Sequence, residues 1–128
     1  VGMVPIAAGT TVDGFERAFG INFLGTAHLT QLLEARGVLR RDGGRVINVS
    51  SEEHRLATLE PHLPSGLRCS AGAQSPRVAA LGAVGTKDSI LNAMERYAYS
   101  KLLLTTFSHE LNRRSKMQVF DVCPGPVA

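Results

Sequence analysis

Arg45-Val-Ile-Asn-Val-Ser-Ser51 is the stretch that decides the fold of this sequence. The segment is short and rich in β-branched residues, and apolar side chains occupy both alternating positions. This pattern is typical of a strand that is covered on both faces of a parallel sheet. We therefore expect a central parallel strand with Ser50 and Ser51 at its carboxyl end, where open parallel sheets bind their ligands.

A second strand and a long helix are predicted farther along the chain. Met117–Cys123 has the pattern of a short strand that Pro124-Gly125 ends. The helix before it begins after Asp88 or Ser89, either of which can cap it, and two arginines near its end favour the helix dipole. Its apolar stripe consists of Leu103, Phe107 and Leu111.

An earlier helix is predicted from near Val12 to about Arg36, with Thr10 or Thr11 as its cap. Gly20 and Gly25 each cost such a helix up to about 1 kcal/mol relative to alanine, so we expect a packing contact or a kink there. The stripe along the helix belongs to the core or, alternatively, to a partner surface, and it consists of Phe15, Phe19, Phe23 and Ala27.

The order helix, strand, helix, strand predicts an α/β fold with a right-handed parallel crossover. Arg40–Gly44 has the composition of a turn before the first strand. Residues 52–87 lose periodicity and gather proline, serine, glycine and alanine, which predicts a long irregular insertion. The 128 residues are thus expected to form one domain that carries this insertion.

Charge and cysteine content exclude several classes of partner. The net charge is +3, yet the basic residues form no dense stripe, so nucleic acid is not the expected partner. Cys69 and Cys123 lack the spacing of a zinc site or of a disulfide framework, and no metal is expected. No apolar run reaches the roughly 18 to 20 residues that a membrane-spanning helix needs.

Tyr97 and Lys101 lie four residues apart in the second predicted helix, so their side chains share one face. Lowering the pKa of a tyrosine by two to three units requires roughly 3 to 4 kcal/mol. A unit charge about 4 Å away contributes about 4 kcal/mol at an effective dielectric constant of about 20, so a lysine can make a tyrosine an acid/base. The alternative is an interfacial tyrosine above a solvated lysine.

Two smaller patterns have structural alternatives. A hydroxyl at Ser50 or Ser51 can polarise a carbonyl, but a serine pair that closes a strand also forms hydrogen-bonded turns. Ser51 and His54 could form a nucleophile and base, although the sequence has no GxSxG elbow and a shared loop explains both residues. Asn48-Val-Ser50 fits a glycosylation acceptor, which its place in a buried strand disfavours.

In their order along the chain, these motifs resemble the short-chain dehydrogenases/reductases, and among them the branch with retinol dehydrogenases and the WW-domain-containing oxidoreductase. The resemblance implies a partial, doubly wound Rossmann-type sheet of which the chain holds the catalytic half. The motifs are TVDGFE from Thr11, FGINFLG from Phe19, RVINVSS from Arg45, YAYSK from Tyr97 and PGPV from Pro124.

The resemblance also implies a role for each site residue. Tyr97 would be the catalytic acid/base, and Lys101 would lower its pKa and bind the nicotinamide ribose. Ser51 would orient the substrate carbonyl or hydroxyl, and Asn22 would hold a water of the proton relay. The residues that would line the nicotinamide pocket are Pro124, Gly125 and Val127.

The reaction implied is hydride transfer between NAD or NADP and an alcohol or carbonyl substrate, such as a retinoid, a steroid or another lipophilic compound. In the resembled family the two long helices often form a homodimer interface. Localisation stays open between the cytoplasm and the endoplasmic reticulum.

The sequence departs from the family pattern in three respects. No glycine-rich turn follows a strand and opens a helix, so the pyrophosphate lacks its usual anchor. Val1-Gly2-Met3 resembles the residues after the family's Asn-Asn-Ala-Gly motif, so we expect a segment cut at both ends. Ser51 and Tyr97 lie 46 residues apart, which is longer than usual and makes the insertion either a lid or a gene-model artefact. The alternative function is therefore a non-catalytic fragment that at most pairs with related subunits, and the isolated chain is expected to be inactive.

Overall fold

The computed structural model describes residues 4, 7, 9–40, 42–57 and 90–125. In chain order, its elements are the π-helix η1 (Phe19–Leu24), the helix α1 (Gly25–Ala35), the strand β1 (Asp42–Val49), the 3-10 helix η2 (Glu52–Leu56), the helix α3 (Ile90–Arg114) and the strand β2 (Lys116–Val122). The predicted strands and the two predicted helices are therefore present in the described residues, and the α/β class is confirmed.

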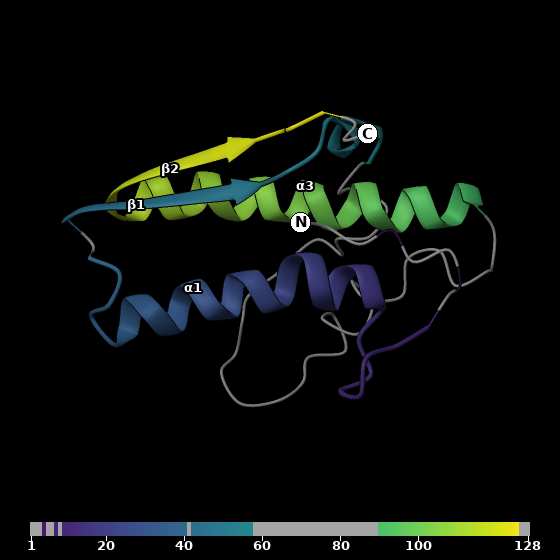
Figure 1. The fold of residues 1–128 in the computed structure, drawn as a ribbon, viewed down its shortest axis with the longest axis horizontal. Helices are drawn as coiled ribbons and strands as arrows, with labels where there is room; N and C mark the ends of the chain where they lie inside the picture. The colour runs from purple at the N-terminus through teal and green to yellow at the C-terminus, as the bar shows by residue number, and fades with distance from the viewer. Residues whose placement is uncertain (1–3, 5–6, 8, 41, 58–89, 126–128) are drawn as a thin grey trace, which may run out of the picture.

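β1 and β2 form a two-stranded parallel sheet, as the sequence predicts. Val46 pairs with Val119, and Asn48 pairs with Asp121. Both arrows in Figure 1 point toward the same end of the molecule, where η2 lies. The carboxyl ends of the two strands therefore share one edge of the sheet.

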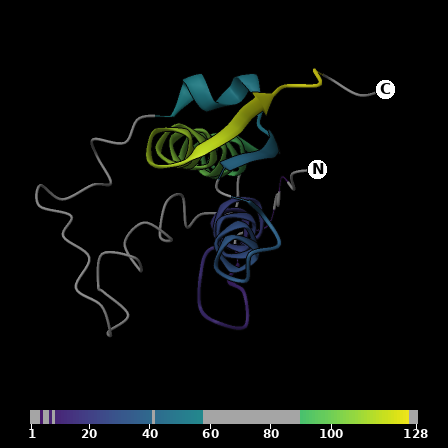
Figure 2. The same ribbon diagram turned by 90° about the vertical axis from the view of Figure 1, so that its left-hand side faces the viewer.

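The helix α3 lies between the sheet and α1. The end-on view of Figure 2 shows α3 with β1, β2 and η2 on one side and α1 on the other. α3 packs against β2, η2 and η1, and its fully buried residues include Ala98, Ser100 and Leu111. α3 is therefore the element that connects the sheet to the first helix.

The first helix begins later than the sequence analysis predicts. Residues 11–15 form a turn in which the Thr11 amide donates to the Phe15 carbonyl at 2.7 Å. Helical residues start at Arg17, because the Glu16 carboxylate accepts hydrogen bonds from the amides of Ala18 at 3.0 Å and Phe19 at 2.8 Å. A carboxylate there also favours the positive end of the helix dipole. The expectation that Thr10 or Thr11 caps a helix from Val12 is wrong.

The two glycines of this helix bracket a π-helical turn. The Gly25 amide donates to the Gly20 carbonyl, five residues earlier, which widens the turn by one residue. A Cβ at position 20 would lie 2.7 Å from Cγ2 of Thr11, so glycine is required there by close approach. The predicted packing contact at Gly20 is confirmed, and the stripe packs internally: the ring centroids of Phe15 and Phe19 lie 5.9 Å apart, and those of Phe19 and Phe23 lie 5.4 Å apart.

β1 begins within the segment predicted as a turn. Asp42 pairs with Lys116, and the register shifts between Asp42 and Arg45. Gly43 has a φ of +74°, which glycine adopts without steric cost. A Cβ at Gly44 would lie 2.2 Å from the Arg40 carbonyl oxygen. The glycines thus form an irregularity at the start of the strand rather than only a turn before it.

The prediction that β1 is covered on both faces is wrong for the described residues. Asn48 and Ser50 face α3 and are buried, whereas Ile47 on the opposite face is 58% exposed. β1 also has only β2 as a neighbour in this sheet, so it is not central there. The residues that begin the insertion, 52–56, form the helix η2. Residues 58–87 of the insertion, the cap residues Asp88 and Ser89, and Val127 lie outside the described residues.

None of the helices in the described part of the chain is both long enough and apolar enough to cross a membrane.

Candidate active site

Tyr97 and Lys101 lie on one face of α3, as their spacing predicts. Nζ of Lys101 lies 5.6 Å from the centroid of the Tyr97 ring. Lys101 is only 2% exposed, so the alternative of a solvated lysine is wrong. Because Lys101 is shielded from water, its positive charge interacts more strongly with the neighbouring aromatic ring than an exposed charge would.

The Lys101 ammonium is held by the backbone of β1. The Ser50 amide donates to the Val122 carbonyl at 2.9 Å, so this peptide unit points its N–H toward β2. Because the two ends of a trans peptide unit point in opposite directions, the Val49 carbonyl faces the other edge of the strand. Nζ of Lys101 donates to that carbonyl at 2.7 Å. Burial lowers the pKa of Lys101, and the electrostatic interaction with Cys123 has a smaller, opposite effect.

Asn22 reaches α3 from the π-helical turn. Its side chain is 4% exposed, and Nδ2 donates to Oγ of Ser100 at 3.1 Å. The Ser100 hydroxyl donates in turn to the backbone carbonyl of Tyr97 at 2.7 Å. Asn22, Tyr97 and Lys101 are therefore brought together, and Ser100 is the residue of this group that the sequence analysis missed.

Ser51 lies at the carboxyl end of β1, as predicted, and is 8% exposed. Its hydroxyl donates to the carboxylate of Glu53, and this hydrogen bond lowers the pKa of Glu53. Nδ1 of His54 donates to the Ser51 backbone carbonyl at 2.6 Å, not to the hydroxyl. The geometry thus gives no support to Ser51 and His54 as a nucleophile and its base.

Two further hydroxyls of α3 hold polar side chains of the sheet. Oγ of Ser50 and Oγ1 of Thr105 share a hydrogen bond of 2.8 Å. Nδ2 of Asn48 donates to Oγ of Ser108 at 2.8 Å, and Ser108 donates to Oδ1 of Asp121 at 2.6 Å. Asn48 is therefore buried and hydrogen-bonded, which agrees with its rejection as a glycosylation site. Thr105 and Ser108, three residues apart on α3, were the sequence signal for this interface.

Pro124 and Gly125 follow β2 at the same edge of the sheet as Ser51. Both are exposed, and Gly125 has a φ of +75°. Gly125 thus has a left-handed backbone conformation, which glycine adopts without steric cost. Among the described residues, no cluster of three histidine, cysteine, aspartate or glutamate side chains could bind a metal.

A cavity of about 200 Å³ lies beside the buried lysine, between η1, β1 and α3. Asn22 and Lys101 line it, together with apolar side chains that include Ile47 and Leu104. Sites for small molecules usually enclose about 300 to 1,000 Å³, so this cavity is too small for a dinucleotide. The residues fit the ribose end of such a cofactor, because Lys101 has three N–H donors for hydroxyls, but no described residue fits the pyrophosphate.

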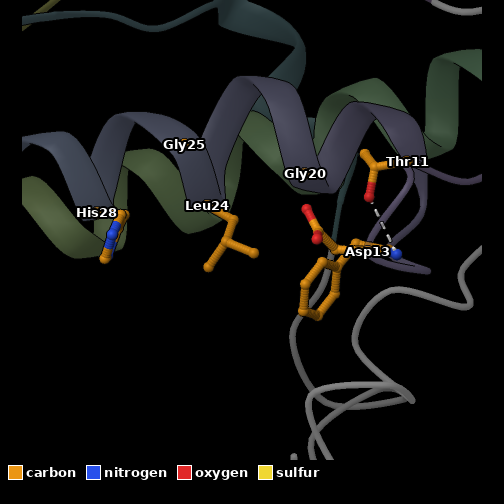
Figure 3. A pocket seen from close by; sticks show the side chains of 7 residues that line it. Thr11, Asp13, Gly20, Leu24, Gly25 and His28 are labelled. Atoms are coloured by element: carbon orange, nitrogen blue, oxygen red, sulfur yellow. Dashed lines mark hydrogen bonds between the residues drawn. The ribbon is translucent and has the colours of Figure 1, made fainter.

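A second hollow lies on the other side of the first helix and contains none of the predicted catalytic residues. Figure 3 shows Asp13 and His28 along its rim, with Gly20, Leu24 and Gly25 on the helix beside it. Its volume is about 300 Å³. The hydrogen bond from the Phe15 amide to Oγ1 of Thr11, at 3.3 Å, closes one end. This hollow is therefore separate from the site around Lys101.

Known proteins resemble the chain over most of its length. Short chain dehydrogenase resG of Aspergillus sclerotiorum is 33% identical over 114 residues, which cover 81% of this chain and 30% of that protein. The WW domain-containing oxidoreductase of Gallus gallus is 39% identical over 105 residues, 81% of this chain and 22% of that protein. Retinol dehydrogenase 11 of Homo sapiens is 32% identical over 120 residues, 91% of this chain and 31% of that protein.

No family model and no solved structure matches the chain. The chain spans less than a third of the length of these curated relatives. The similarity nevertheless extends over 81% to 91% of the chain. On this similarity, the chain belongs to the short-chain dehydrogenase/reductase family.

Proposed function

We propose that the chain supplies the acid/base residues of an NAD(P)-dependent oxidoreductase that interconverts an alcohol and an aldehyde or ketone. The observation that supports this most strongly is the buried Lys101 ammonium, 5.6 Å from the centre of the Tyr97 ring on the same helix face. On one helix face, a phenol and an ammonium are close enough to act together on a bound substrate and cofactor. The similarity to named dehydrogenases supports the same class of reaction.

In the direction of reduction, the Tyr97 hydroxyl would give its proton to the substrate oxygen. Lys101 would stabilise the phenolate that remains, and its ammonium would bind the ribose hydroxyls. A bound nicotinamide supplies the hydride that the carbonyl carbon accepts. The product alcohol thus gains one hydride and one proton, and the reverse reaction removes both.

Ser51 and Asn22 would orient the substrate and water, and would not transfer protons themselves. For this role, the hydrogen bond from the Ser51 hydroxyl to the Glu53 carboxylate must be replaced by one to the substrate oxygen. Asn22 would order water next to Lys101, since both residues line the same cavity. Pro124, Gly125 and Val127 would bound the nicotinamide, in a doubly wound sheet larger than the two strands described here.

The substrate we propose is a lipophilic alcohol or aldehyde, such as a retinoid or a steroid. The name of retinol dehydrogenase 11, which is similar over 91% of this chain, supports this class. Either NAD or NADP fits the proposal. Nucleic acid is not a proposed partner.

A second candidate is that the isolated chain is not catalytic and at most pairs with related subunits through its helices. The observation that favours it is the sequence itself, which has no glycine-rich turn for the pyrophosphate. Leu29, which is 56% exposed, and Leu32 would contribute to such a helix contact from α1. Saturable binding of NADPH to the 128 residues would contradict this candidate.

Transfer of deuterium from labelled cofactor tests the proposed reaction. The protein that contains this chain is incubated with NADPH or NADH deuterated at the nicotinamide and with a long-chain aldehyde. We expect one deuterium on the carbinol carbon of the product, measured by mass spectrometry. A product without deuterium, or no product with any aldehyde or ketone of this class, would contradict the proposal.

A further inference from the structure

Ser100 is the buried residue that connects the π-helical turn to the catalytic turn of α3. It is 0% exposed, and it lies between Tyr97 and Lys101 in the sequence. Its hydroxyl donates to the Tyr97 carbonyl and accepts from Nδ2 of Asn22. One hydroxyl thus joins residues that are 75 positions apart in the sequence, in two different helices.

The single proton of this hydroxyl determines which end of the Asn22 amide faces α3. A serine hydroxyl has one donor and two acceptor positions. Because the proton is directed to the Tyr97 carbonyl at 2.7 Å, Ser100 can only accept on its other side. Only the amide nitrogen of Asn22 can donate to it, so the amide oxygen must point away from Ser100.

The orientation of Asn22 matters because its side chain lines the same cavity as Lys101. At 4% exposure, an amide that loses Ser100 gains little contact with bulk water in return. The π-helical turn that carries Asn22 is closed by the hydrogen bond from the Gly25 amide to the Gly20 carbonyl, and this backbone bond does not set the orientation of the side chain. The hydrogen bond to Ser100 links this side chain directly to the turn of α3 that carries Tyr97 and Lys101.

We propose that Ser100 is a positioning residue: its hydroxyl holds Asn22, with a defined amide orientation, against the turn of α3 that carries Tyr97 and Lys101. The proposal rests on the proposed function for its catalytic consequence, but not for the geometry itself. It therefore predicts one effect on the Asn22 amide and a second, separable effect on turnover.

The test compares Ser100→Ala and Ser100→Cys with the control Thr106→Ala. Thr106 also donates to a carbonyl of its own helix, that of Leu102 at 2.8 Å, but it is exposed. Cysteine keeps the approximate volume of Ser100 yet is a weak donor and acceptor, so it separates hydrogen bonding from packing. The first readout is the exchange rate of the Asn22 side-chain amide protons, measured by NMR on the ¹⁵N-labelled protein.

We expect both Ser100 variants to accelerate this exchange about tenfold or more and Thr106→Ala to leave it unchanged. In the deuterium-transfer assay, we expect kcat to fall about ten- to a hundredfold with little change in KM. Unchanged exchange in the folded Ser100→Cys variant would overturn the proposal, and so would faster exchange with a wild-type kcat. Full recovery by cysteine would also overturn it, because packing alone would then explain the effect.

The two proposals fail in different ways. If the wild-type protein transfers no deuterium to any substrate of the class, the proposed function is wrong, whereas the exchange comparison still decides whether Ser100 positions Asn22. If Ser100→Ala does not fold, Ser100→Cys carries the test.

Discussion

The two faces of the β1–β2 sheet are opposite in character. On the inner face, Asn48 and Ser50 are buried and hydrogen-bonded to hydroxyls of α3. On the outer face, apolar side chains that pair across the strands are exposed, namely Ile47, Val49, Phe120 and Val122. The buried polar side chains of Asn48 and Ser50 on one face thus contrast with the exposed apolar side chains on the other.

This difference shows how the site is positioned. Buried polar groups require partners, because an unsatisfied one costs about 1 to 3 kcal/mol, so each hydrogen bond fixes α3 relative to β1 at a defined place. Apolar contacts are less directional, and the outer face contributes no such constraint to the site. The placement of Lys101 under β1 thus depends on the inner face.

The largest predicted effect concerns Tyr99, a buried residue of α3 that is 2% exposed. Burial raises the pKa of Tyr99 to about 12 from its ordinary 10. Between these two pH values, Tyr99 loses its proton in the unfolded chain but keeps it in the folded protein. The free energy of unfolding is therefore unaffected by Tyr99 below pH 10 and falls by about 3 kcal/mol as the pH rises to about 12. Urea unfolding across this range should show the loss in the wild type and a smaller loss in Tyr99→Phe.

Titration of Lys101 changes the free energy of unfolding in the opposite direction, because the pKa of Lys101 is lowered in the folded protein. Its buried charge costs stability at lower pH, and this cost disappears as pH rises toward the ordinary value near 10.5. Because both the wild type and Tyr99→Phe contain Lys101, its contribution cancels in the difference between their free energies of unfolding. Equal alkaline loss in both proteins would contradict the assignment to Tyr99.

A smaller effect is predicted for Ser108→Ala on the inner face. The change removes the acceptor of Asn48 and the donor to Asp121, so we expect a loss of about 1 to 3 kcal/mol in the free energy of unfolding. Chemical denaturation measures this, with Thr106→Ala as the exposed control. A loss no larger than that of the control would mean that the inner face does not depend on these hydrogen bonds.

The smallest effect is predicted for Ile47→Thr on the outer face. Ile47 is 58% exposed and threonine keeps the β-branched shape, so the free energy of unfolding should change by no more than about 0.5 kcal/mol. The same denaturation experiment measures it. A loss above about 1.5 kcal/mol would show that this face is covered in solution and would weaken the contrast between the two faces.

The elements of this fold were predictable from local patterns, but their surroundings were not. The β-branched residues of β1 and the Pro-Gly break after β2 identify both strands and their parallel order. The exposure of Ile47 depends on which elements pack against the outer face of β1. The sequence of the strand itself does not encode this. The start of the first helix was missed because Glu16 competes with Thr10 and Thr11 as cap. A tertiary contact, the ion pair from Arg96 at 3.4 Å, adds to the local hydrogen bonds that favour Glu16.

The site was partly predictable for a similar reason. The spacing of Tyr97 and Lys101 fixes their common face on any helix, and their proximity is confirmed. The contact of Asn22 with Ser100 depends on a π-helical turn, for which two glycines five residues apart were the only local signal. The roles of all the predicted site residues stay predictions, namely those of Asn22, Ser51, Tyr97, Lys101, Pro124, Gly125 and Val127.

The central claim is that Tyr97, beside the buried Lys101, transfers the proton of an oxidoreductase reaction. The most direct test measures the reduction of a long-chain aldehyde with NADPH or NADH by the protein that contains this chain. It compares the Tyr97→Phe variant with Tyr99→Phe, a matched control that also loses one phenol hydroxyl. The account predicts that Tyr97→Phe lowers kcat at neutral pH by a factor of about a hundred or more, while Tyr99→Phe stays within about threefold of the wild type. Turnover by folded Tyr97→Phe at the wild-type rate would contradict it.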